Sequence, residues 1–127
     1  MWNADATLEA LPDAVIGINR EGVIELVNRA TEHIFGYNRE EIIGHPLAML
    51  LPERMRERHE AHLKHYFAAP AVRGMGLDLI LLGIGKDGVE FPVEINIAPL
   101  SDTGAIAVVR RVSERVQRAL KFARERG

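Results

Sequence analysis

The chain has 127 residues, a formal net charge of −2, 47% hydrophobic and 27% charged residues, and no cysteine. This length fits one domain. The absence of cysteine excludes disulfides, thiolate catalysis and cysteine-ligated zinc, and it fits a protein of a reducing compartment. The small negative charge argues against nucleic acid as a partner. Since no run approaches the ~20 apolar residues of a membrane helix, we expect a soluble, cytoplasmic domain without a membrane partner.

The N-terminal part predicts a short helix followed by a β-hairpin. Residues 5–11 can form an amphipathic helix that Pro12 ends. Residues 14–19 and 24–27 are apolar and strand-like, and they flank a turn in which Gly22 can take a positive φ. We therefore expect these strands to pair antiparallel.

Two short helices with start and stop signals follow the hairpin. Asn28 can cap the free N–H groups of the first, and Gly36 stands where a left-handed C-cap is expected. Asn38 begins the second, with Glu41 as its capping-box partner and Gly44 as its end. Two capped helices this short, directly after a strand, are an unusual arrangement.

A longer helix is predicted over residues 52–67, because Pro52 suits the first helical position. The stripe that we expect to face inward comprises Met55, His59, His62, Leu63 and Tyr66. The opposite face of the helix carries alternating charges and is expected to be solvated.

The second half predicts three more strands and a closing helix. We expect a loop over 68–76, strands over 77–84, 89–97 and 105–112, and a helix over 113–126. Two hairpins without βαβ alternation indicate an antiparallel α+β fold. The last helix carries a seam that must pack on the sheet or on a partner chain, formed by Val112, Val116, Ala119 and Ala123.

Two stretches of the sequence resemble the PAS family of sensor domains. One is N-x-A-x5-G-Y-x2-E-E-x2-G, here Asn28, Ala30, Gly36, Tyr37, Glu40, Glu41 and Gly44; the other is KDGVEFPVEI, at 86–95. The resemblance implies a PAS fold: a five-stranded antiparallel sheet in the order 2-1-5-4-3, short helices on one face and a ligand cavity between. It divides the chain into an N-terminal cap segment (1–12), a sensor domain (13–112) and a C-terminal signalling helix (113–127).

The resemblance implies a sensory and regulatory role rather than an enzyme activity. Such a domain would serve a bacterial signalling protein, for example a two-component histidine kinase, a cyclase or a transcription regulator. A small ligand or cofactor would bind between the sheet and the helix 52–67, and the exit helix would relay its occupancy to an effector domain. A homodimer through the N-terminal segment, the exit helix or both is expected. The family's Asp-Ile-Thr hinge reads Arg111-Val112-Ser113 here, which keeps only the apolar middle and the hydroxyl.

The residues expected to line the ligand site are His59, Met55, His62, Leu63, Val72, Met75, Leu77, Ile95 and Ile97. Position 59 resembles that of the proximal iron ligand in the haem-binding oxygen sensors of the family, and a neutral imidazole can serve as an axial ligand. Leu77 stands where those proteins have a basic residue. The cysteinyl-flavin chemistry of light-sensing PAS proteins is excluded.

Three interpretations of the site remain open at this point. The first is an unidentified small ligand, and the second is haem with His59 bound to its iron. The third is a ligand-free dimerisation module whose cavity is filled by Met55, Leu63 and Leu77. A metal site built from His59, His62 and His65 is less favoured, because zinc requires more ligands and His65 lies off the inner stripe.

Overall fold

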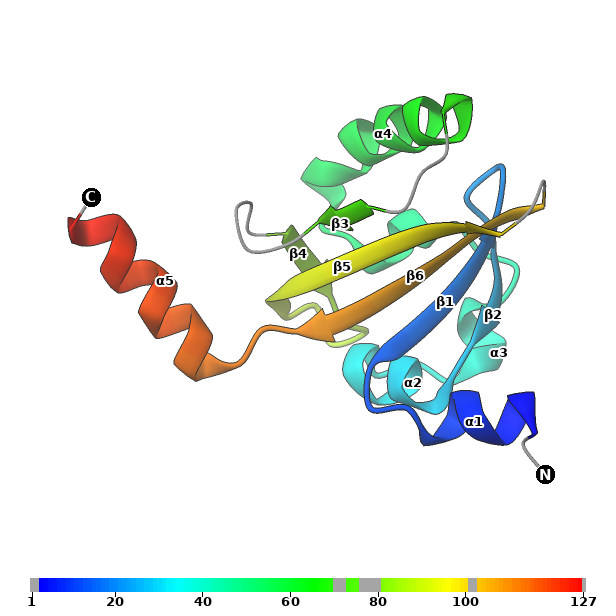
Figure 1. Cartoon of the computed structure of the whole chain (residues 1–127), viewed down its shortest axis with the longest axis horizontal. Coiled ribbons are helices and arrows are strands. Elements are labelled where there is room, and N and C mark those ends of the chain that lie inside the picture. The colour runs from blue at the N-terminus through cyan, green and yellow to red at the C-terminus, as the bar shows by residue number, and fades with distance from the viewer. Residues whose placement is uncertain (1–2, 70–72, 76–80, 101–102, 127) are drawn as a thin grey trace.

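The computed structural model describes residues 3–69, 73–75, 81–100 and 103–126. The strands form one antiparallel sheet, with helices packed on one face and the last helix extending away from it (Figure 1). The helices are α1 (Ala4–Ala10), α2 (Arg29–Phe35), α3 (Arg39–Ile42), α4 (Arg56–Ala68) and α5 (Glu114–Arg126), with 3-10 turns η1 (Leu47–Leu50) and η2 (Glu53–Met55). The strands are β1 (Ala14–Asn19), β2 (Ile24–Val27), β3 (Arg73–Met75), β4 (Leu81–Ile84), β5 (Glu90–Leu100) and β6 (Gly104–Arg111).

The sheet has the order β2-β1-β6-β5-β3, and β4 also pairs with β5. This confirms the predicted order and the antiparallel α+β fold, with one difference at the edge. The predicted third strand is present as β4, whereas its first residues, 77–80, lie outside the described part of the chain.

The prediction of a continuous loop over 68–76 is wrong at residues 73–75. Gly74 and the neighbouring Pro70 and Gly76 favour a loop locally, but β3 pairs antiparallel with the middle of β5, with Arg73 opposite Ile97. Hydrogen bonding to a strand distant in sequence overrides the local preference. Residues 47–50 form the 3-10 turn η1, and the first residues of the predicted helix 52–67 form η2 rather than α-helix.

The core lies on the face of the sheet that the helices cover. Because side chains alternate along a strand, the register of β1, β6 and β5 brings Ile16, Ala107 and Ile97 into one row. Helical side chains close over this face, and the cluster includes Phe35, Ile42, Leu50, Tyr66 and Phe67.

Asn28 is buried and connects β1, α1 and α2 through a hydrogen-bonded network. Its Oδ1 accepts from the backbone N–H groups of Val15 (2.9 Å) and Thr31 (3.2 Å), and it lies 2.9 Å from the Thr31 hydroxyl. Its Nδ2 donates to the carbonyls of Leu8 (2.9 Å) and Asp13 (3.0 Å). The predicted N-cap is therefore confirmed, and the same side chain also fixes the N-terminal helix.

The caps predicted around the two short helices are also present. Gly36 ends α2 with φ 78°, in the left-handed region. The Asn38 N–H donates to Glu41 Oε2 at 3.1 Å, and Glu41 also accepts from Lys86 Nζ at 2.6 Å. These contacts hold α3 against the turn between β4 and β5.

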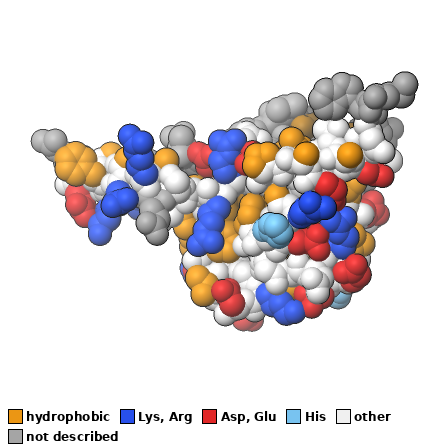
Figure 2. Space-filling view, turned by 90° about the horizontal axis from the view of Figure 1, so that it is seen from below, with side chains coloured by type: hydrophobic (Ala, Val, Ile, Leu, Met, Phe, Trp, Pro, Cys, Tyr) orange, Lys and Arg blue, Asp and Glu red, His pale blue; other side chains and the backbone are white. Residues whose placement is uncertain are grey.

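The exit helix α5 begins where β6 ends. Ser113 Oγ accepts from the Val116 N–H (3.2 Å), while Gln117 Nε2 donates to the Val112 carbonyl (2.8 Å). Figure 2 shows α5 extending from the rest of the domain and carrying both basic and hydrophobic side chains. Of the predicted seam, Val112 is buried, whereas Val116, Ala119 and Ala123 are exposed and left open by the described part of this chain.

Candidate functional site

Helix α4 is anchored at both of its ends. Just before it, Arg54 in η2 forms paired hydrogen bonds of 2.7 Å to both carboxylate oxygens of Glu90, the first residue of β5. At its other end, Arg20 Nη2 donates to the Phe67 carbonyl at 3.2 Å, and the guanidinium carbon lies 5.4 Å from the centroid of the Phe67 ring. These contacts connect α4 to the start of β5 and to the β1–β2 turn.

The second half of α4 packs tightly, whereas its first half does not. Tyr66 and Phe67 are buried in the core, and Leu63 packs against it. A Cβ on Gly22 would lie only 2.7 Å from Leu63 Cδ1, which shows how closely the β1–β2 turn approaches this helix. Among the described residues, no α4 side chain before Leu63 belongs to the core cluster.

His59 lies one turn before Leu63 and is half-buried. Burial lowers the pKa of His59 below its usual 6.5, and the neighbouring His62 lowers it further. Since withdrawal from water disfavours the charged form, the imidazole is held neutral. A neutral imidazole has the free lone pair that a hydrogen-bond acceptor or metal ligand requires.

The sheet presents Ile95 and Ile97 on the same face as the core. Ile97 is buried, whereas Ile95 is only partly buried and packs at the edge of the core cluster. Ile95 lies opposite Val109 on β6 and Met75 on β3, in the middle of the sheet. Ile95 is thus a residue of the inner face whose side chain the core cluster covers only in part.

The other predicted site residues are distributed as follows. Met55 is half-buried beside the start of α4. The expectation that His62 faces inward is corrected, because it is exposed. Successive side chains of an α-helix are rotated by about 100° about the helix axis. The inward-facing stripe of α4 is centred near Leu63 and includes Phe67, so the His62 side chain lies beside that stripe. Val72, Leu77 and the Met75 side chain lie outside the described part of the chain.

Local sequence places Arg20 in the turn before Gly22 and Arg54 at the charged start of the predicted helix, so it does not predict their contacts with Phe67 and Glu90. Arg111 also lies on the core side of the sheet, opposite Val93. The alternation of β6 contains this signal, since Arg111 follows Ala107 and Val109 at spacings of two.

A family profile for the PAS fold matches residues 4–112. The chain belongs to the PAS family. Its PAS domain is 33% identical over 97 residues to the sensor protein FixL of Bradyrhizobium diazoefficiens, a match covering 76% of this chain and 19% of FixL. It is 30% identical over 99 residues to the oxygen sensor protein DosP of Escherichia coli, covering 76% of this chain and 12% of DosP.

The structure of the PAS domain of an HTR-like protein from Haloarcula marismortui superposes with a TM-score of 0.71 at 22% identity, covering 85% of this chain and 88% of that one. This likeness shows the fold. The PAS domain spans less than a fifth of the length of both FixL and DosP. None of the helices in its described part is long and apolar enough to cross a membrane. The chain is thus a sensory domain of the kind found in signalling proteins.

Proposed function

We propose that this PAS domain binds a small ligand or cofactor between α4 and the inner face of β5. The observation that carries the proposal is the uneven packing of α4, which is anchored at both ends while its first half stays out of the described core. The partly buried Ile95 and the half-buried, neutral His59 supply an apolar wall and one polar group. Apolar walls with a few polar groups are typical of small-molecule sites.

We propose further that occupancy is relayed through α5 to an effector domain of a longer signalling protein. The Val112 N–H donates to the Pro92 carbonyl at 2.9 Å, so β5 is connected directly to the residues that begin α5. A ligand on β5 shifts α5 only if it binds more tightly to one arrangement of this junction than to the other.

A thermal-shift screen of small molecules tests the binding site. A ligand that binds only the folded chain raises its melting temperature. We expect at least one compound to stabilise the wild type and to lose this effect in Ile95→Trp, where an indole fills the space beside β5. Asn96→Trp is the matched control, because Asn96 is the next residue on the strand and is exposed. Equal stabilisation of both variants would place the ligand elsewhere.

Haem is the cofactor candidate that specific observations favour. The described residues fit it in part: His59 is a half-buried imidazole whose lowered pKa keeps its lone pair free, and Ile95 and Ile97 provide an apolar wall. The similarity to DosP, named an oxygen sensor, points the same way. His59 would hold the iron, and haem would supply reversible binding of a diatomic gas or a change of redox state.

Titration of the protein with hemin tests this candidate. We expect a Soret band that His59→Ala abolishes and that His65→Ala, an exposed histidine on the same helix, leaves intact. Since the pKa of His59 lies below 6.5, the band should persist when the pH falls just below that value. A band of the same intensity in His59→Ala would reject His59 as the iron ligand and leave the general ligand site untouched.

A further inference from the structure

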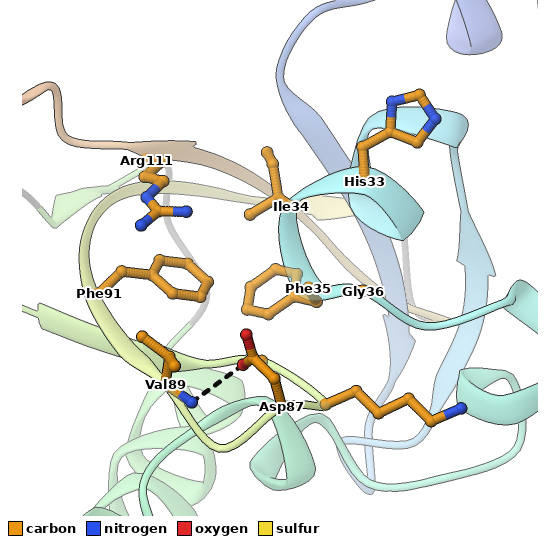
Figure 3. A pocket seen from close by; sticks show the side chains of 10 residues that line it. His33, Ile34, Phe35, Gly36, Asp87, Val89, Phe91 and Arg111 are labelled. Carbon is orange, nitrogen blue, oxygen red and sulfur yellow. Dashed lines mark hydrogen bonds between the residues drawn. The ribbon is translucent and has the colours of Figure 1, made fainter.

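A surface pocket lies away from α4, between α2, the β4–β5 turn and the ends of β5 and β6. Its volume is about 440 Å³, within the range of small-molecule sites. Figure 3 shows two aromatic rings among the residues that line it, Phe35 and Phe91, whose centroids lie 5.4 Å apart at an interplanar angle of 49°. Both side chains belong to the buried core, so they present only a small surface to the pocket. Ile34 extends this apolar surface.

Arg111 supplies a positive charge at one side of this pocket. Its guanidinium carbon lies 4.6 Å from the centroid of the Phe91 ring, and in the described part of the chain no carboxylate is within ion-pair distance of it. The neighbouring Arg110 differs, because it pairs with Asp13 at 3.0 Å from the other face of β6. Within the described residues, Arg111 is therefore a cation that an aromatic ring holds in place without a carboxylate partner.

The other charged groups around the pocket are already engaged. Lys86 Nζ donates to Glu41 at 2.6 Å, and Asp87 Oδ1 accepts from the Val89 N–H at 2.9 Å. Asp87 lies on the opposite side of the aromatic pair from Arg111 (Figure 3). A bound molecule thus meets the guanidinium of Arg111 at one side and the carboxylate of Asp87 at the other.

We propose that this pocket binds a small aromatic monocarboxylate. Its carboxylate pairs with the guanidinium of Arg111, whose planar fork of donors matches two carboxylate oxygens. Its ring packs against Ile34 and edge-on against the small exposed part of Phe35 and Phe91. A second negative charge at the far side of the ring is disfavoured by Asp87, so the pocket selects a monoanion over a dianion.

The position of the pocket connects it to the exit helix. Arg111 is the last residue of β6, and Val112 and Ser113 separate it from α5. A carboxylate that restrains the Arg111 side chain acts on the strand end from which α5 begins. This second site lies apart from the proposed site under α4, so an experiment can contradict one proposal and leave the other unaffected.

Titration of the ¹⁵N-labelled chain with benzoate, followed by NMR, tests the proposal. We expect saturable shifts of the backbone amides of Gly36, Gly85 and Val89, with Arg111→Gln weakening the affinity about tenfold or more, as for loss of a charged hydrogen bond. Arg110→Gln, which removes the same charge from the opposite face, should leave the affinity unchanged. Acetate, benzyl alcohol and phthalate should each bind more weakly than benzoate.

Substitutions at Val89 test the charge preference independently, because this pocket residue is 55% exposed and tolerates change. Val89→Lys should tighten benzoate binding and Val89→Asp should weaken it, which keeps the test valid if Arg111→Gln does not fold. Benzoate shifts confined to amides outside the pocket, or equal affinities in the Arg111 and Arg110 variants, would overturn the proposal.

Discussion

Asn28 shows how a single polar side chain can determine the way several elements meet. It is fully buried, and both ends of its amide are hydrogen-bonded, to the backbones of β1, α1 and α2 and to the Thr31 side chain. A buried polar group of this kind stabilises a fold only while all its hydrogen bonds are made. If the group is removed, each buried partner loses its hydrogen bond and its desolvation cost is no longer offset.

We expect Asn28→Ala to lower the free energy of unfolding by about 2 kcal/mol or more, because it leaves the Val15 N–H and the Asp13 carbonyl buried without this partner. Asn3→Ala is the control, since Asn3 caps α1 at an exposed position, where loss of a cap costs about 1 kcal/mol. Urea denaturation measures both. If the two variants lose equal stability, the network is not central to the fold.

The sequence predicts this residue well because capping is a local interaction. As caps, Asn28, Gly36 and Glu41 act on backbone groups within a few residues, so their spacing alone reveals this role. The bonds of Asn28 to Leu8, Asp13 and Val15 span 13 to 20 residues, and the sequence did not predict them. Arg111 could not be recognised in the same way, since its ring partner Phe91 is close in space through the β5–β6 pairing and distant in sequence.

Among the secondary-structure elements, strands that local sequence defines were predicted, and strands that depend on contacts between distant residues were not. The strands 14–19 and 24–27 were predicted with their observed bounds, because short apolar runs on either side of a turn define them locally. Strand β3 depends on the register with β5, which local preference does not contain. The anchoring of α4 by Arg20 and Arg54 is of the same long-range kind.

Helix α5 lies apart from the sheet, and a helix of 13 residues is marginal by itself. We therefore propose that a second copy of the chain covers the exposed seam formed by Val116, Ala119 and Ala123. Sedimentation should show a dimer for the wild type and a monomer for Val116→Glu/Ala123→Glu, because burying these carboxylates in a helix pair is unfavourable.

The control for this prediction is Arg118→Gln/Lys121→Gln, on the opposite side of α5. Both double variants change the net charge by the same amount, so a difference between them reports on the seam rather than on charge. A wild-type monomer, or dissociation of the dimer by the control variant alone, would contradict the assignment of the seam.

For the whole molecule, the antiparallel sheet and the helices on one face provide the frame for the two proposed sites. One proposed site lies under α4 beside Ile95, and the other lies beside Arg111. Arg111 directly precedes the residues from which α5 leaves the sheet, and the strand that carries Ile95 is hydrogen-bonded to them through Pro92. This arrangement suits a domain that converts occupancy into a change at its C-terminal helix.

Native mass spectrometry of the whole chain, purified gently from cells, tests the central claim most directly. We predict that the wild type carries a small molecule beyond the polypeptide mass and that Ile95→Trp loses it while Asn96→Trp retains it. A wild-type spectrum containing only the bare polypeptide, or an adduct that all three proteins share, would contradict a ligand site between α4 and β5.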